Sequence, residues 1–328
     1  MKIIFTFAVC FLFACSIIAQ QKNRYGMNII ENEGGNCKIE EYELINKIID
    51  LSKVDDLYEP YNYVADKIKD SDYNKCTTKS YIFKKYNTYS LNMEIDQPTE
   101  GCSPYPFIIY VHGGGWNTGD TNAFANQSKY MASKGIAGIR VTYTLNKNGG
   151  HFEQGLQEIA EAFDFIKKHA KEWNLDMKRF GFAGGSAGTP LSSYWAMKMK
   201  DCKLYIGCNG IYDFTARIKP QGSFPNKNVY LRNITTENKA REVSALFLVP
   251  KNDPPAVLVA HGTADTTIPY QQSEALCNAI EVNGGKTVRL IYPYYVHGFF
   301  NKNRSDKYEE VILKMYEFVK EVFNHTCT

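Results

Sequence analysis

The clearest pattern in the chain is a series of short, almost wholly apolar segments separated by polar and helical stretches. Six such segments occupy residues 107–112, 135–143, 180–185, 204–210, 256–262 and 288–294. Continuously apolar strands are typical of a parallel sheet that helices cover on both faces. Helical spacing of apolar residues at 154–173 and 308–323 predicts two of these covering helices. The sequence therefore predicts a doubly wound, mostly parallel α/β fold.

Three regions differ from this alternating pattern. Residues 80–87 and 89–96 alternate apolar and polar side chains, so we expect an antiparallel pair of strands at one edge of the sheet. Residues 20–75 are mostly polar with one amphipathic stretch, and we interpret them as an N-terminal arm or helix ahead of one large domain at 76–328. Residues 215–253 are rich in Pro, Asn and Lys. Two interpretations of this insertion stay open, namely a surface excursion and a lid or substrate wall above the sheet.

The first 19 residues hold one Lys and a nearly unbroken apolar run that ends in small residues before Gln20 and Gln21. This is typical of a secretory signal peptide, so we predict that residues 1–19 are removed. A membrane anchor is the alternative, but the run is shorter than the roughly 20 apolar residues of a spanning helix, and no later stretch is long enough. We therefore expect a secreted or extracellular protein, or one in the lumen of the secretory or lysosomal pathway, without a transmembrane segment.

Export changes how the cysteines are interpreted. The seven cysteines after the signal peptide are Cys37, Cys76, Cys102, Cys202, Cys208, Cys277 and Cys327. In an oxidising compartment most should form disulfides, which leaves one free thiol or one intermolecular bridge. Spacing alone cannot fix the pairing, but Cys76 and Cys102 flank the predicted strand pair and Cys202 and Cys208 lie close together on another strand, so both are candidate pairs. No Cys-x-x-Cys or His-x-x-x-His spacing indicates a metal site. Glycosylation sequons, which agree with export and predict a glycoprotein, begin at Asn126, Asn233, Asn303 and Asn324.

A Gly-x-Ser-x-Gly pentapeptide at residues 184–188 directly follows an apolar run and precedes a predicted helix at 189–199. On a strand-turn-helix of this kind, the Ser has a strained backbone conformation that lifts its hydroxyl to the N-terminus of the helix. Gly184 and Gly188 are then required, because only small residues let the strand and the helix come close together. The motif predicts Ser186 as a nucleophile, although glycine- and serine-rich turns without chemistry are common.

A glycine run after the first predicted parallel strand strengthens this interpretation. Residues 112–116 read His-Gly-Gly-Gly-Trp. Glycines let backbone amides approach a reacting carbonyl closely, as an oxyanion hole requires. We assign its donors to the N–H groups of Gly114 and Gly115, together with that of Ala187, which follows the nucleophile. A phosphate-binding loop is the alternative, but the Gly-x-Gly-x-x-Gly and Walker patterns are both absent.

A serine hydroxyl is a poor nucleophile by itself, so it needs a histidine base and an acid that orients the base. Among the six histidines, His297 follows the last predicted strand, and Asp265 follows the strand before it. The resulting chain order of nucleophile, acid and base is typical of enzymes with such a serine turn. Asp213 and Asp253 are rival acids, but the first comes one strand too early and the second precedes its strand.

Four motifs occur one after another between residues 100 and 320, namely HGGGW, GGSAG, HGTAD and VHGF. In this combination the chain resembles carboxylesterases related to hormone-sensitive lipase and the feruloyl-esterase-like group, both of the α/β-hydrolase superfamily. The resemblance implies a triad of Ser186, Asp265 and His297, an oxyanion hole of the three amides named above, and no metal or organic cofactor. Many relatives on the lipase side have Asp where this chain has Gly185, and their large helical cap is not evident in residues 20–75.

These observations together predict a secreted serine hydrolase that cleaves carboxylic esters through an acyl-enzyme. Its substrate is expected to be a small-molecule ester or a lipid or carbohydrate ester. Two alternatives stay open, because the same triad can cleave amides in a peptidase or amidase and the same scaffold can serve a non-catalytic binding protein. A nucleic-acid partner is not expected, since the formal net charge of +3 comes from interleaved basic and acidic residues.

Overall fold

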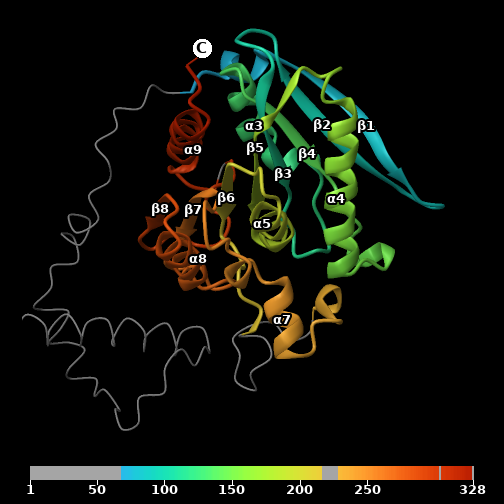
Figure 1. Ribbon diagram of the computed structural model, residues 1–328, viewed down its shortest axis with the longest axis vertical. Coiled ribbons are helices and arrows are strands. Elements are labelled where there is room, and N and C mark those ends of the chain that lie inside the picture. Colours follow the sequence, from blue (N-terminus) through green and yellow to red (C-terminus); the bar gives the residue numbers. More distant parts are fainter. Residues whose placement is uncertain (1–67, 216–227, 303, 327–328) are drawn as a thin grey trace, which may run out of the picture. The chain divides into compact units, whose positions relative to one another are not determined.

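The computed structural model describes residues 68–215, 228–302 and 304–326. These residues form one eight-stranded sheet in the spatial order β1-β2-β4-β3-β5-β6-β7-β8 (Figure 1). The strands are β1 (Cys76–Lys85), β2 (Ser90–Pro98), β3 (Tyr105–Val111), β4 (Ala137–Val141), β5 (Leu175–Gly185), β6 (Leu204–Cys208), β7 (Ala256–Gly262) and β8 (Thr287–Tyr292). Strands β3 to β8 run parallel to one another, whereas β1 and β2 form an antiparallel edge in which β2 pairs antiparallel with β4. The predicted parallel sheet and its antiparallel edge are both confirmed.

Burial explains why the central strands read as continuous apolar runs. Every residue of β3, β4 and β6 is buried, because helices cover both faces of the sheet. The edge strand β1 instead has no buried residue, and in β2 buried residues alternate with exposed or half-buried ones from Ser90 to Ile95. This difference in burial is the physical origin of the two hydrophobic patterns in the sequence.

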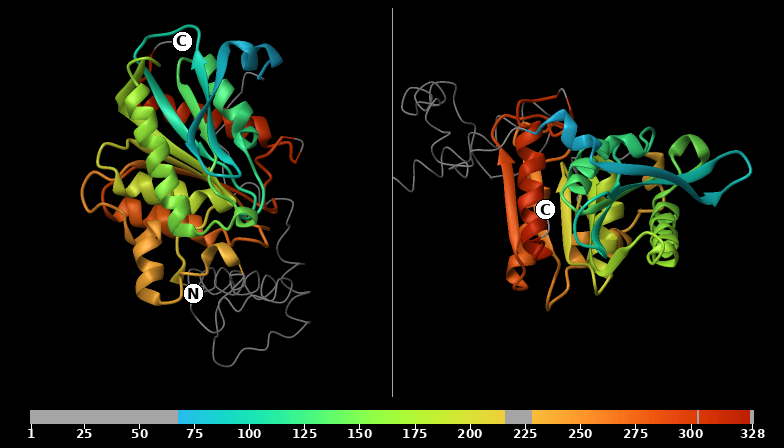
Figure 2. Two further views of the ribbon diagram at one scale, coloured as in Figure 1. Left: turned by 90° about the vertical axis from the view of Figure 1, so that its right-hand side faces the viewer. Right: turned by 90° about the horizontal axis from the view of Figure 1, so that it is seen from above.

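Helices lie on both faces of the sheet (Figures 1 and 2). The covering helices are α3 (Ala125–Ser133), α4 (Phe152–His169), α5 (Thr189–Lys198), α8 (Gln271–Val282) and α9 (Tyr308–Val322), whereas α7 (Glu237–Val243) lies beyond the ends of the strands. Ile108 and Tyr110 of β3 belong to the hydrophobic core under α3 and α9. The alternate residue Phe107 stacks on Phe180 of β5, which in turn contacts Phe163 of α4. The pattern at 154–173 and 308–323 thus predicts α4 and α9 to within a few residues, with α4 ending earlier than expected.

A buried ion pair joins the antiparallel edge to the parallel part of the sheet. Arg140 of β4 donates two hydrogen bonds to Asp96 of β2, from Nε to Oδ2 at 2.7 Å and from Nη2 to Oδ1 at 2.9 Å. Asp96 also accepts hydrogen bonds from the hydroxyls of Thr78 in β1 and Ser128 in α3. The carboxylate and guanidinium are almost fully buried, so each needs these partners to be tolerated in the interior.

The insertion predicted at 215–253 is described from residue 228 onward. This part contains the short 3-10 helix η6 (Val229–Leu231), α7 and a second 3-10 helix, η7 (Ala245–Phe247). Tyr230 stacks on Trp116 with ring centroids 5.5 Å apart, and Asn228 Nδ2 donates to the carbonyl oxygen of Gly115 at 3.3 Å. The segment that returns from the insertion therefore packs against the glycine loop that follows β3.

Several predictions lie wholly or largely outside the described residues. They are the signal peptide at 1–19, the arm at 20–75 up to residue 67, Cys37, Cys327 and the sequon at Asn303. From residue 68 onward the arm contains a 3-10 helix, η2 (Asp70–Asn74), which leads into β1. In the described part of the chain, no helix has the length and apolar character needed to span a bilayer.

Both candidate disulfide pairs are wrong. Cys76, Cys202 and Cys208 are free thiols, so Cys76 does not pair with Cys102, nor Cys202 with Cys208. The second pairing fails because residues 204–208 form the extended strand β6. At about 3.3 Å per residue, such a strand separates its ends by roughly 13 Å, beyond the ~7 Å between Cα atoms that a disulfide can span. Cys202 and Cys208 are close in sequence but cannot bond, because an extended strand places residues only a few positions apart far from each other in space.

Candidate active site

The nucleophile turn has the strained geometry that its sequence predicts. Ser186 directly follows β5 and is the first residue of a short 3-10 helix, η5 (Ser186–Gly188), and its φ is +49°. A Cβ on Gly188 would lie 2.2 Å from the carbonyl oxygen of Val111, and one on Gly184 would lie 2.2 Å from Ser192 Oγ. Both glycines are therefore required by the close approach of strand and helix. Because neither glycine has a side chain, Ser186 can present its hydroxyl at the carboxyl ends of the parallel strands.

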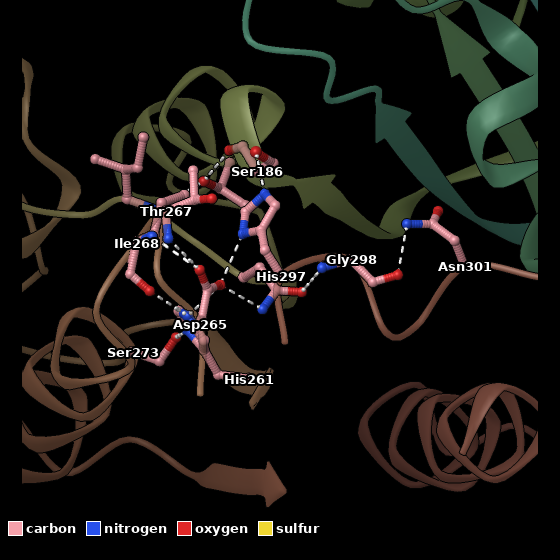
Figure 3. Close-up of polar contacts among 12 residues, drawn as sticks. Ser186, His261, Asp265, Thr267, Ile268, Ser273, His297, Gly298 and Asn301 are labelled. Carbon is pink, nitrogen blue, oxygen red and sulfur yellow. Dashed lines mark hydrogen bonds and ion pairs between the residues drawn. The ribbon is translucent and has the colours of Figure 1, made fainter. Parts of the chain in front are cut away.

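The structure brings together the three residues of the predicted triad (Figure 3). His297 Nε2 lies 2.9 Å from Ser186 Oγ, and His297 Nδ1 lies 2.7 Å from Asp265 Oδ2. A carboxylate can only accept, so Nδ1 carries the proton and Nε2 is left to accept the serine proton. The His297 side chain is 25% exposed while that of Asp265 is 0% exposed, so the imidazole can meet a substrate and the acid cannot.

Asp265 sits in a dense set of hydrogen-bond donors. Its Oδ1 accepts from the backbone N–H groups of Thr267 and Ile268, at 2.8 and 2.9 Å. Its Oδ2 accepts from Asn209 Nδ2 at 2.8 Å and faces His261 Nε2 at 3.1 Å, besides His297. Burial alone would raise the pKa of Asp265, but the hydrogen bonds from the two histidines and the backbone outweigh it and hold the pKa well below its usual range. The acid is thus an anion at neutral pH.

Asn209 and His261 are site residues that the sequence reasoning did not single out. Asn209 follows β6 with a φ of +49°, a conformation that Asn tolerates, and its Oδ1 accepts from the N–H of Gly298 at 3.2 Å. It thereby joins the acid loop to the loop that carries His297. Both residues lie at carboxyl ends of parallel strands, which meet at one edge of the sheet, and His261 is also the first residue of the HGTAD motif.

The glycine loop lies directly against the nucleophile. A Cβ on Gly113 would come within 3.2 Å of Ser186 Cβ. Within the described residues, the N–H groups of Gly114, Gly115 and Ala187 have no hydrogen-bond acceptor. Free amide donors beside the serine are what the predicted oxyanion hole requires. The role of these three amides in catalysis stays a prediction.

Hydrogen bonds on carbonyl oxygens set the direction of these amides. His112 Nδ1 donates to the carbonyl oxygen of Gly113 at 2.8 Å, and the N–H groups of Asn117 and Thr118 both donate to that of Gly114 at 3.1 Å. In a trans peptide the carbonyl and the next N–H point in opposite directions, so each bond also fixes the following N–H. Burial lowers the pKa of His112, which keeps this ring neutral. The loop is therefore ordered before any substrate arrives.

Comparison with known proteins identifies the family of the chain. A family model described as BD-FAE matches residues 93–280. The chain belongs to the BD-FAE family. The matched range includes Ser186 and Asp265 but ends before His297, so the base of the site lies in the part of the chain beyond the match.

Two curated relatives are about a quarter identical to the chain over the aligned residues. A probable isoprenylcysteine alpha-carbonyl methylesterase of Oryza sativa subsp. japonica is 23% identical over 227 residues, which are 61% of this chain and 52% of the relative. An acetyl esterase of Salmonella typhi is 24% identical over 240 residues, which are 67% of this chain and 72% of the relative. The chain thus matches about half the length of the rice protein.

Solved structures show the same architecture. Esterase 2 of Thermogutta terrifontis in its apo form has a TM-score of 0.64 at 22% identity, covering 75% of this chain and 94% of that one. The propionate-bound form of that esterase has a TM-score of 0.65 at 21% identity, covering 77% and 97%. With the family match, this establishes the α/β-hydrolase fold that the motif resemblance implied.

Proposed function

We propose that this protein is a serine hydrolase that cleaves carboxylic esters through an acyl-enzyme. The observation that carries the proposal is the continuous hydrogen-bonded series from Ser186 Oγ through His297 to Asp265, with unpaired amides beside the serine. The names of its relatives support ester substrates, because the rice and Salmonella proteins are both called esterases. Substrates fitting the proposal are small-molecule, lipid or carbohydrate esters.

The proposed reaction has two halves. His297 Nε2 takes the Ser186 proton as Oγ attacks the acyl carbon, and the amides of Gly114, Gly115 and Ala187 stabilise the tetrahedral oxyanion. The imidazolium then gives its proton to the departing alcohol, which leaves an acyl group on Ser186. In the second half, His297 takes a proton from water, the hydroxide attacks the acyl carbon, and the carboxylic acid is released with the serine regenerated.

A short-chain nitrophenyl ester tests the proposal directly. Ser186→Ala should lower kcat by on the order of 10⁶, since nearly all turnover above binding effects depends on the nucleophile. Ser133→Ala is the matched control, because Ser133 lies at the end of α3 and its hydroxyl donates only to the nearby carbonyl of Tyr130. Undiminished turnover by the Ser186→Ala protein would sink the assignment.

A fluorophosphonate separates the rival functions. A non-catalytic binding protein would leave Ser186 unlabelled, whereas an active serine hydrolase reacts there. Peptide and ester substrates carrying the same acyl group then separate an amidase from an esterase. Faster cleavage of the amide than of the ester would favour the peptidase or amidase alternative.

We also propose export, on the N-terminal sequence alone. N-terminal sequencing of the mature protein should find a start close to Gln20, after removal of residues 1–19. Asn233 and Asn324 are exposed, so their sequons would then be the ones open to glycosylation, with the Asn233 amide donating to Glu153 Oε2 at 3.2 Å. Asn126 is half-buried, and its amide donates to Tyr308 Oη at 2.6 Å. An intact residue 1 in protein collected from the medium would contradict the cleavage.

A further inference from the structure

A second histidine contacts the same carboxylate oxygen as the catalytic base. His261 Nε2 in β7 lies 3.1 Å from Asp265 Oδ2 and 3.0 Å from the carbonyl oxygen of Ile268. Its Nδ1 lies 2.7 Å from Ser273 Oγ, in the first turn of α8. Figure 3 shows the result as one polar series that runs from Ser186 through His297, Asp265 and His261 to Ser273.

Ser273, His261 and Asp265 have the composition of a second triad, but they cannot act as one. Ser273 and His261 are both 0% exposed, so no substrate reaches that hydroxyl. The ring is also turned the other way, with Nε2 toward the acid and Nδ1 toward the serine. Any effect of His261 on chemistry must therefore pass through Asp265.

The neighbours of His261 determine its tautomer. Both groups near Nε2, the Asp265 carboxylate and the Ile268 carbonyl, can only accept hydrogen bonds, so Nε2 carries the proton. In the neutral ring Nδ1 is then an acceptor, and the Ser273 hydroxyl can turn to donate to it. Asp265 Oδ2 therefore faces an N–H from each of two imidazoles.

We propose that His261, whose Nε2–H form is set by the acceptors of Asp265 and Ile268 and matched by Ser273 at Nδ1, is a positioning residue that aims the Asp265 carboxylate at His297. Each oxygen of Asp265 accepts from more than one donor, so the carboxylate cannot rotate without losing bonds. A carboxylate that keeps its direction keeps the His297 ring in the tautomer and orientation that accept the Ser186 proton. The inference rests on the proposed function, since the base must be held only if the site turns over.

Kinetics of two His261 variants test the inference. His261→Phe keeps a planar ring but removes both ring nitrogens, and it should lower kcat for a nitrophenyl ester by about tenfold or more, with KM changed less than about twofold. His261→Gln restores an N–H donor close to the Nε2 position and should recover most of that loss. An unchanged kcat in folded His261→Phe, or a His261→Gln protein no better than it, would overturn the proposal.

Two serines provide a matched pair of controls. Ser273→Ala removes the partner of His261 Nδ1 and should lower kcat, by less than His261→Phe. Ser128→Ala is the control, because Ser128 too has a fully buried hydroxyl, which donates to the carboxylate of Asp96 and lies away from the site. Equal kcat losses in the two serine variants at equal thermal stability would show a general packing effect and contradict positioning.

A measurement independent of turnover follows the ring itself. In protein labelled with ¹⁵N at histidine, the His261 signals near neutral pH should show a protonated Nε2 and a bare Nδ1. A protonated Nδ1 with a bare Nε2 would overturn the inference, whatever the activity. If instead the tautomer is as stated but Ser186→Ala leaves turnover intact, the proposed function fails while the geometry around Asp265 stands.

Discussion

The nucleophile side and the acid side of the site are built by different means. Around the nucleophile, backbone conformation sets the geometry, with φ values of +49° at Ser186, +107° at Gly114 and +61° at Gly115. Around Asp265, hydrogen bonds converge from the ends of β6 and β7, from the loop after β8 and from the loop that carries the acid itself. On the nucleophile side, backbone N–H groups must stay unpaired so that they can bind a substrate. On the acid side, both carboxylate oxygens must have hydrogen-bond donors. Each side therefore responds differently to substitution.

After the loss of the nucleophile itself, the largest effect is expected at the acid. Asp265→Asn keeps the volume of the side chain but replaces the carboxylate that holds His297 Nδ1–H. A wrong tautomer of the base should lower kcat by on the order of 10⁴ without unfolding the protein. Steady-state kinetics with a nitrophenyl ester, read beside the melting temperature, measure this. A loss of less than about tenfold would mean that a different group orients His297.

A second variant probes the backbone side. Gly114→Ala places a side chain where φ is +107° and its Cβ would lie 2.2 Å from the carbonyl oxygen of Thr118, so the loop must shift. Loss of one oxyanion donor lowers kcat by about 10² to 10³. Gly284→Ala is the matched control, because its φ is +79° but nothing lies within 4 Å of the added Cβ. Equal losses of kcat in the two variants would assign the effect to backbone strain alone.

A third variant probes the side chains that surround the acid. Asn209→Asp keeps the size and the acceptor for Gly298 N–H but sets a second carboxylate 2.8 Å from Asp265 Oδ2. Like charges this close raise the pKa of one carboxyl, so we expect kcat to fall by about tenfold at neutral pH, with a rising acid limb in the pH profile. Asn174→Asp is the control, since Asn174 has a similar φ of +50° and is exposed. If the ratio of the kcat of the Asn209→Asp variant to that of wild type were the same at every pH, the electrostatic account would be contradicted.

The smallest effect is expected in stability at low pH. The pKa of Asp265 is depressed in the folded protein, so its contribution is present above the pKa of an unfolded aspartate, about 3.9, and is lost as pH falls toward the folded value. The free energy of unfolding of wild type should therefore decrease more steeply below about pH 4 than that of the Asp265→Asn variant. Urea unfolding at a series of pH values measures both curves. Parallel curves would show that the surroundings of Asp265 do not favour its charged form.

The two sides also differ in how far they could be predicted. Gly184, Ser186, Gly188 and the glycine run are contiguous motifs, because backbone shape depends on neighbouring residues. Asp265 and His297 could be predicted from their order after the last two strands. Asn209 and Ser273 belong to none of the motifs, and His261 opens the HGTAD motif without any role that the motif alone reveals, so the importance of all three follows from the atoms that they contact. The same limit explains the cysteine error, in which closeness along the chain was taken for closeness in space.

The amino-acid sequence by itself determined the alternation of buried strands and amphipathic helices, the strained serine turn and the glycine loop, because burial and local backbone sterics act over a few residues. Only the tertiary structure decided which groups surround the carboxylate of Asp265 and which cysteines stay apart. Parallel strands bring their carboxyl ends to one edge from positions far apart in the chain, and the pairing of side chains there depends on register and on loop paths. Hydrogen bonds are formed over about 3 Å, a scale that the hydrophobic pattern does not resolve.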